Sequence, residues 1–176
     1  MALRARIAVM AAAMIFTVTA GAVHAQAPTH GVNPREPDPA VWVQSIYDLY
    51  KRAEKDDTLL RYANYNLVQK RAARPLLLLF KKDEACMKKN GGGPCAFDAD
   101  FIINGQDFEI SDVKVSPAVM NGDKATVTVN FKNFKADNTN RFYFVKQGDL
   151  WKVSDVTSQT GKDKPSKLTD MFKNSN

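Results

Sequence analysis

The sequence predicts an α+β domain in which N-terminal helices pack on a curved four-stranded antiparallel sheet. Between residues 38 and 89, apolar residues recur at a spacing of about 3.6 positions, which is typical of amphipathic helices. Glycines follow at residues 91–93, and beyond them apolar and polar residues alternate, as they do in half-buried strands. Helices first and strands second is the order expected of an α+β fold.

The first 25 residues are predicted to be a secretory signal peptide. Arg4 and Arg6 precede an apolar run, and Val23 and Ala25 occupy the small-residue positions that a signal peptidase reads. A retained membrane anchor is the alternative, but a spanning helix needs about 20 clean apolar residues. We therefore expect cleavage after Ala25, a periplasmic mature protein and no transmembrane segment after cleavage.

The mature chain has the length of one domain. Removing residues 1–25 from the 176-residue chain leaves 151 residues, and the loss of two arginines lowers the formal net charge from +6 to +4. We expect a flexible leader at 26–37, a single α+β domain at 38–157, and a polar tail at 158–176 that forms a short helix or is disordered. The charge is too small to indicate a nucleic-acid partner, although helix lysines are compatible with weak contact with an anionic envelope surface.

Three helical segments precede the glycines. Asp38 and Pro39 predict the start of the first helix, as a capping acceptor followed by a ring suited to the first turn. Its predicted apolar face consists of Trp42, Ile46, Leu49, Tyr50 and Ala53. The stretch from residue 59 to 73 predicts a short helix and a turn, and Arg74-Pro75 begins a third helix.

The strand predictions begin at residue 108. The apolar phase slips between Ile110 and Val113, which predicts a bulge near Ser111 and Asp112. Asn121-Gly122 predicts a tight hairpin turn. The remaining predicted elements are a strand at 125–134, a loop at Lys135–Asn140, a strand at 141–146, a turn at 147–149 and a last strand at 150–156.

The two cysteines, Cys86 and Cys95, predict a disulfide. An even count at short spacing in an exported chain is typical of a structural pair. A redox-active pair is the alternative, but such pairs favour Cys-X-X-Cys spacing at a helix start.

Several segments resemble the nuclear-transport-factor-2-like (cystatin-like) superfamily and, within it, a family of exported bacterial proteins known as a domain of unknown function. The resemblance lies in the Trp/Tyr-rich first helix, in FDADFIINGQDF and in DLWKVSDV, and it covers roughly residues 40–157. It implies a sheet that wraps the first helix and leaves a cone-like cavity open at one end. This architecture hosts isomerases, dehydratases, immunity proteins and binding modules, so it does not by itself imply an activity.

No catalytic constellation is evident. His30 is the one histidine left after cleavage, so histidine-based acid–base catalysis or metal binding is not expected. Asp98, Asp100 and Glu109 have some of the spacing of a calcium loop, but isoleucines stand where that loop needs an oxygen ligand and a glycine. We expect no metal and no cofactor, with Asp98 and Asp100 capping turns.

The aromatic residues and two carboxylates suggest a candidate pocket. Its predicted members are Trp42, Tyr50, Tyr62, Asp107, Tyr143, Trp151 and Asp155. A carboxylate buried among aromatic rings could act as a base, whereas the same residues also suit an ordinary core. The preferred hypothesis is a periplasmic, non-enzymatic binding module for an unknown protein or small molecule. The alternatives are a small acid–base enzyme using Asp155 or Asp107, and an immunity protein against a periplasmic toxin.

Overall fold

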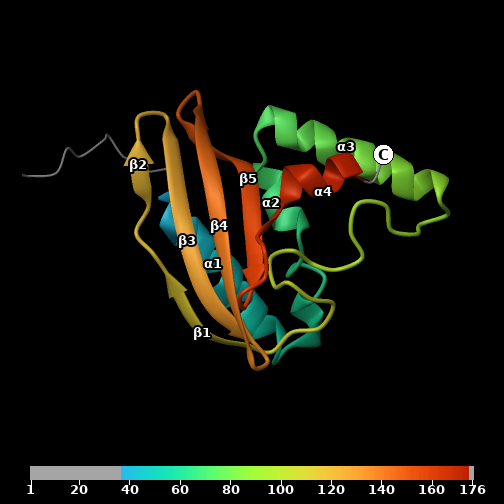
Figure 1. Cartoon of the computed structure of the whole chain (residues 1–176), viewed down its shortest axis with the longest axis horizontal. Coiled ribbons are helices and arrows are strands. Elements are labelled where there is room, and N and C mark those ends of the chain that lie inside the picture. Colours follow the sequence, from blue (N-terminus) through green and yellow to red (C-terminus); the bar gives the residue numbers. More distant parts are fainter. Residues whose placement is uncertain (1–36, 175–176) are drawn as a thin grey trace, which may run out of the picture. The chain divides into compact units, whose positions relative to one another are not determined.

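The computed structural model describes residues 37–174, so the predicted signal peptide and nearly all of the predicted leader lie outside the described residues. In chain order the elements are α1 (Pro39–Ala53), a 3-10 turn η1 (Asp57–Leu59), α2 (Asn66–Arg71), α3 (Arg74–Lys89), β1 (Ile110–Val115), β2 (Val119–Asn121), β3 (Lys124–Asn133), β4 (Ala136–Gln147), β5 (Leu150–Thr160), β6 (Ser166–Lys167) and α4 (Leu168–Asn174). The α+β class is confirmed, with most helices before the sheet (Figure 1).

The sheet has six strands rather than the predicted four. Its order is β1-β3-β4-β5-β6, β2 pairs with β3 beyond the end of β1, and every pairing is antiparallel. β2 has three residues and β6 has two, and such short strands carry no measurable alternation in the sequence. They become strands because a long neighbour offers them backbone hydrogen bonds.

Two local predictions are confirmed on the strands. The register between β1 and β3 shifts between Ser111 and Lys114, and Asp112 has a φ of 52°, which is the predicted bulge. Asp112 also forms a 3.1 Å ion pair with Lys132 of β3. The β2–β3 hairpin turns where predicted, and Gly122 takes the left-handed φ of 56° that the tight turn requires.

The predicted loop at Lys135–Asn140 is wrong. The turn consists of Phe134 and Lys135 alone, and β4 pairs with β3 from Ala136 onward. The prediction failed because residues 136–140 contain no large apolar side chain. Asn138 and Asn140 nevertheless occupy buried positions of the strand, where their side chains are hydrogen-bonded.

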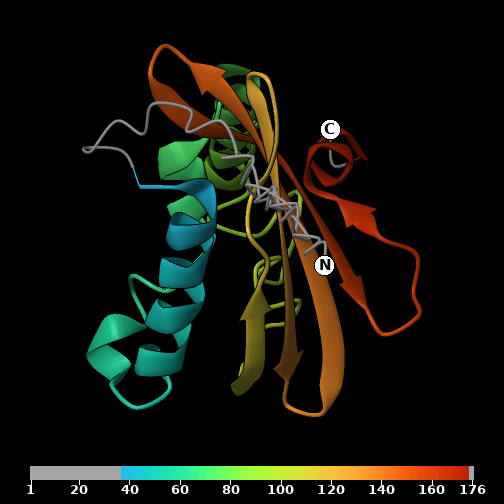
Figure 2. The ribbon, with the colours of Figure 1, turned by 90° about the vertical axis from the view of Figure 1, so that its left-hand side faces the viewer.

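Helix α1 begins as the sequence predicts and contacts the sheet. The Asp38 carboxylate accepts a 2.7 Å hydrogen bond from the Ala40 backbone N–H, and Pro39 opens the first turn. The Tyr47 ring lies 4.9 Å from that of Phe131 on β3, and the Trp42 ring packs edge-on against Phe142 on β4. Figure 2 shows α1 alongside one face of the strands.

Helices α2 and α3 are attached to β5. The Ala73 backbone N–H donates a 2.7 Å hydrogen bond to the Val153 carbonyl, between α2 and the start of α3. At the other end of α3 the predicted disulfide between Cys86 and Cys95 is formed. Among residues 37–174, no helix combines the length and apolarity that a membrane crossing requires.

The folded part continues past the predicted domain end at 157. β5 extends to Thr160, and the predicted polar tail at 158–176 contains β6 and α4. Leu168 and Phe172 of α4 are buried, and the Phe172 ring lies 4.9 Å from that of Phe80 on α3. Two apolar residues spaced four apart are enough to fix one face of a short helix, although they leave the segment polar on average.

Candidate functional site

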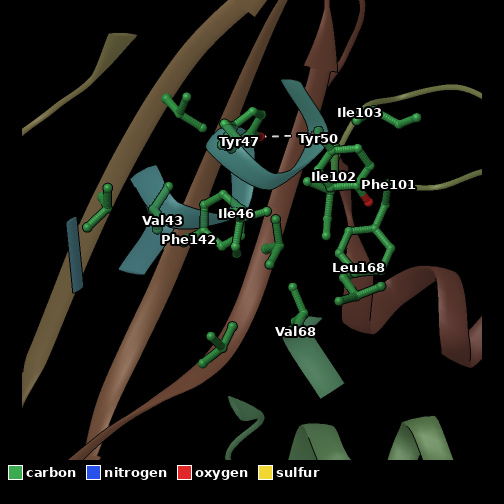
Figure 3. Close-up of a cluster of buried hydrophobic side chains, with 14 of the residues drawn as sticks. Val43, Ile46, Tyr47, Tyr50, Val68, Phe101, Ile102, Ile103, Phe142 and Leu168 are labelled. Carbon is green, nitrogen blue, oxygen red and sulfur yellow. Dashed lines mark hydrogen bonds between the residues drawn. The ribbon is translucent and has the colours of Figure 1, made fainter. Parts of the chain in front are cut away.

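A loop contributes three apolar side chains to the hydrophobic core beside α1 and is here called the core loop (residues 100–105). Its ends are joined by reciprocal backbone hydrogen bonds between Asp100 and Gly105, of 2.9 and 3.2 Å. Phe101, Ile102 and Ile103 project from it and are 4%, 0% and 1% exposed, within the same buried cluster as the α1 side chains (Figure 3).

A buried polar cluster holds the core loop against α1. The Tyr47 hydroxyl donates a 3.0 Å hydrogen bond to the Ile102 carbonyl (Figure 3). The Asn140 amide of β4 donates to the Tyr47 oxygen at 3.0 Å and to the same Ile102 carbonyl at 2.8 Å. Burial raises the pKa of Tyr47 well above its ordinary value, so the phenol stays neutral and keeps its proton for the loop.

Asp100 is the second anchor of the core loop. One carboxylate oxygen accepts the Tyr50 hydroxyl, and the other accepts the Ile102 backbone N–H at 2.8 Å. Burial raises the pKa of Asp100 to about 6, against the lowering effect of hydrogen bonds from Tyr50 and from the Ile102 and Tyr65 backbones. Burial also raises the pKa of Tyr50, and the neighbouring Asp100 charge adds to that increase. The predicted turn-capping role of Asp100 is therefore confirmed, and the residue is also a partly buried acid.

Asp100 lines a cleft of about 320 Å³, here called the Asp100 cleft. One wall is the segment from Ala96 to Asn104, and the other consists of the end of β5, the connection to β6 and Met171 of α4. The charged and aromatic residues of the lining are Phe97, Asp98, Asp100, Phe101, Asp163 and Lys164. Three carboxyl groups against one ammonium make the lining acidic, and two phenyl rings give it an apolar surface.

Tyr143 and Asp155 of the predicted pocket lie together elsewhere, on the face of the sheet opposite α1. They line a depression of about 680 Å³ with Lys124, Thr126 and Lys167. The Asp155 carboxylate accepts hydrogen bonds from the Val156 and Thr169 backbones at 2.9 and 3.2 Å and from the Thr169 hydroxyl at 2.7 Å.

Asp155 therefore acts as the polar support of α4. In addition to its hydrogen bonds, it forms a 3.2 Å ion pair with Lys167, which raises the pKa of that lysine. Four partners use about all the acceptor sites of a carboxylate. These partners orient the Asp155 carboxylate toward β6 and α4.

The other predicted pocket residues lie apart from these two sites. Trp42 and Trp151 are linked through Arg71, whose guanidinium lies 5.0 Å from the Trp42 ring centre and whose Nε donates to the Trp151 carbonyl at 3.0 Å. Tyr62 is 53% exposed, and Asp107 lies beside a separate depression near Asn133 and Phe134. Of the seven predicted pocket residues, Tyr143 and Asp155 lie together, and Tyr50 contacts Asp100. The structure therefore brings the predicted pocket together only in part.

Asp100 is the residue that sequence reasoning did not place in the pocket. The sequence places it two positions after Asp98 and directly before Phe-Ile-Ile, with Asn-Gly immediately following. An acidic residue next to a short apolar run between turn residues is a signal for a buried loop with a capped end. Within the part of the chain that the structure describes, no three His, Cys, Asp or Glu side chains are grouped as a metal site requires.

Comparison of the chain with protein-family models, with curated proteins and with solved structures finds no match. A function is therefore inferred from the residues that line the Asp100 cleft.

Proposed function

We propose that the protein is an exported, non-enzymatic binding module of the bacterial periplasm that holds a small molecule in the Asp100 cleft. The disulfide supports export, because such bonds persist in oxidising compartments. The signal-like sequence of residues 1–25 supports it independently. Helices followed by an antiparallel sheet, with α1 beside that sheet, also support membership of the nuclear-transport-factor-2-like superfamily.

The observation that carries the proposal is the Asp100 carboxyl in the wall of the cleft. A carboxylate has about four acceptor sites, and Tyr50 and two backbone N–H groups use three of them. The fourth is available to a ligand in a partly desolvated environment, where hydrogen bonds to charge are strong. With Asp98, Asp163 and two phenyl rings nearby, the cleft favours a small cation such as an amine.

A thermal-shift titration tests the proposal with putrescine and choline as cationic probes and acetate as an anionic one. We expect the cations to raise the melting temperature of the exported protein and acetate to leave it unchanged. Asp100→Asn should abolish the cation effect. Asp123→Asn is the matched control, since Asp123 is exposed in the β2–β3 turn, and it should preserve the effect. If no amine raises the melting temperature of the wild type, or if amines raise that of Asp100→Asn equally, the assignment of the cleft is contradicted.

A second candidate function, acid–base catalysis, is favoured by one observation. A general base works best with a pKa near the working pH, and burial places the pKa of Asp100 at about 6. Proton exchange into deuterated water at the carbon next to the carbonyl of a small ketone measures this chemistry. Acceleration that rises through pH 6 and disappears in Asp100→Asn would support the enzyme, and unaccelerated exchange would favour the binding module.

A further inference from the structure

The exposed face of α3 carries a stripe of five cations that the Asp100 cleft does not use. They are Arg74, Lys81, Lys82, Lys88 and Lys89, and all five are exposed. At 3.6 residues per turn, their positions fall within an arc of about 120° on the helix surface. We call this set the basic stripe.

Leu78 lies within the arc of the basic stripe and is 53% exposed. The opposite face of α3 is buried through Leu76, Phe80 and Asp83. The helix therefore presents cations around a central apolar side chain to solvent, and clusters of Lys and Arg on a helix are attracted to anionic lipid surfaces.

Acidic side chains are excluded from the stripe. Asp83 points into the fold and accepts the Ala96 backbone N–H at 2.8 Å, and Glu84 at the flank accepts the Gln69 amide at 2.5 Å. Among residues 37–174, none of the five cations forms an ion pair. By contrast, Lys132 and Lys167 on the sheet each face a carboxylate, whereas the five cations of the basic stripe lie on one helix face with no carboxylate of the described chain in contact.

The basic stripe lies on one uninterrupted helix. The sixteen residues of α3 extend about 24 Å, and the disulfide links its last turn to the following loop. Figure 1 shows α3 projecting sideways beyond β5, with α4 on one side of it. A row of cations on one uninterrupted helix fits a flat anionic surface, whose headgroups can move to meet each charge. An acidic protein would need carboxylates at matching positions.

We propose that the basic stripe docks the exported protein on the anionic phospholipid surface of a membrane, with Leu78 inserted between headgroups. The lysine stems can extend along the headgroup layer while Leu78 enters the acyl boundary. This surface is separate from the Asp100 cleft, so the two proposals stand or fail independently.

Vesicle flotation tests the docking. The protein is purified after export, since the apolar segment at 1–25 would itself enter lipid. We expect binding to vesicles of phosphatidylcholine containing phosphatidylglycerol, no binding to phosphatidylcholine alone, and release at high salt. A cation near an anionic surface contributes about fivefold in affinity, so removing three should weaken binding roughly a hundredfold.

Two triple variants of equal net charge distinguish the stripe from general attraction. The stripe variant is Lys81→Gln with Lys82→Gln and Lys88→Gln, and the control is Lys124→Gln with Lys135→Gln and Lys162→Gln, all exposed. Only the stripe variant should bind the vesicles about a hundredfold more weakly. Leu78→Ser, which leaves the net charge unchanged, should also weaken vesicle binding. Equal losses in both triple variants, or an absence of vesicle binding, would overturn the proposal. Stripe-dependent capture of polyglutamate without vesicle binding would assign the surface to an acidic protein instead.

Discussion

Two loops between α3 and β1 are held in place by different forces. The disulfide loop (residues 86–95) is closed by a covalent bond, and its residues from Asn90 to Gly92 are exposed. The core loop has no cross-link, yet Phe101, Ile102 and Ile103 are almost completely buried. The covalent bond thus lies where burial contributes little, and burial and hydrogen bonding are concentrated ten residues further along the chain.

This difference indicates that the core loop dominates stability and the disulfide loop confines one end of a helix. Cross-linking stabilises mainly by restricting the unfolded chain, whereas the core loop acts through apolar area removed from water. Substitutions in the two loops should therefore differ in size and in their dependence on pH and on reducing agent.

The largest effect is expected from Ile102→Ala. Ile102 is fully buried, and its loss leaves a cavity beneath α1, so the free energy of unfolding should fall by about 2–5 kcal/mol. Urea denaturation followed by far-UV circular dichroism measures the change. Leu78→Ala, at a 53% exposed position, is the control and should change stability by less than about 0.5 kcal/mol. A loss below 1 kcal/mol for Ile102→Ala would show that the core loop is not part of the cooperative core.

Asp100→Asn should change how stability depends on pH. The folded pKa of Asp100 is about 6, above the ordinary aspartate value of about 3.9, so the folded state binds the proton more tightly. This group therefore favours the folded state at low pH and costs up to about 3 kcal/mol as the pH rises through 6. Between pH 4 and pH 7 the wild type should lose stability relative to Asp100→Asn, as measured by urea titrations. Parallel pH profiles for the two proteins would contradict the buried-acid assignment.

Replacing both cysteines, Cys86→Ser with Cys95→Ser, should lower the free energy of unfolding by about 2–3 kcal/mol, because the bond closes a loop of about ten residues. The same urea titration measures it. With a reducing agent present, wild type and variant should unfold together. If reduction leaves wild-type stability unchanged, the native bond does not contribute as described.

The smallest effect is expected at the glycines of the disulfide loop. Gly92 has a φ of 93°, so Gly92→Ala should cost about 1 kcal/mol of backbone strain even though the site has free space. Gly93 lacks a left-handed φ and tolerates a Cβ at 3.4 Å from its nearest neighbour, so Gly93→Ala serves as the matched control. Differential scanning calorimetry of the two variants should show the lower melting temperature for Gly92→Ala, and equal values would contradict the strain.

Features encoded by neighbouring residues could be predicted from the sequence. The cap at Asp38, the slip at Ser111 and Asp112, and the Cys86–Cys95 pair each depend on a few adjacent positions. The start of β4 could not be predicted, because its buried positions hold Asn138 and Asn140, and the need for those amides is visible only once the core loop lies beside them.

The candidate site was less predictable, since its geometry depends on register between distant elements. The sequence places Tyr143 and Asp155 on adjacent strands, where they pair directly. The register between β4 and β5 shifts directly after that pair, and the sequence does not reveal this shift or that the Asp155 carboxylate turns toward α4. Nor does any local pattern specify that Tyr50 meets Asp100 rather than the other predicted pocket residues.

The Tyr47 hydroxyl has a consequence for the order of folding. It joins α1 to the Ile102 carbonyl, 55 positions along the chain, and to Asn140, 93 positions along it. Contacts between residues so far apart in the sequence form only after a long loop has closed. The entropy lost in closing that loop slows folding. Although α1 precedes β4 in the chain, it cannot complete its polar contacts until β4 has formed. We therefore expect α1 to dock late in folding. Until then, its tyrosines should be exposed to solvent.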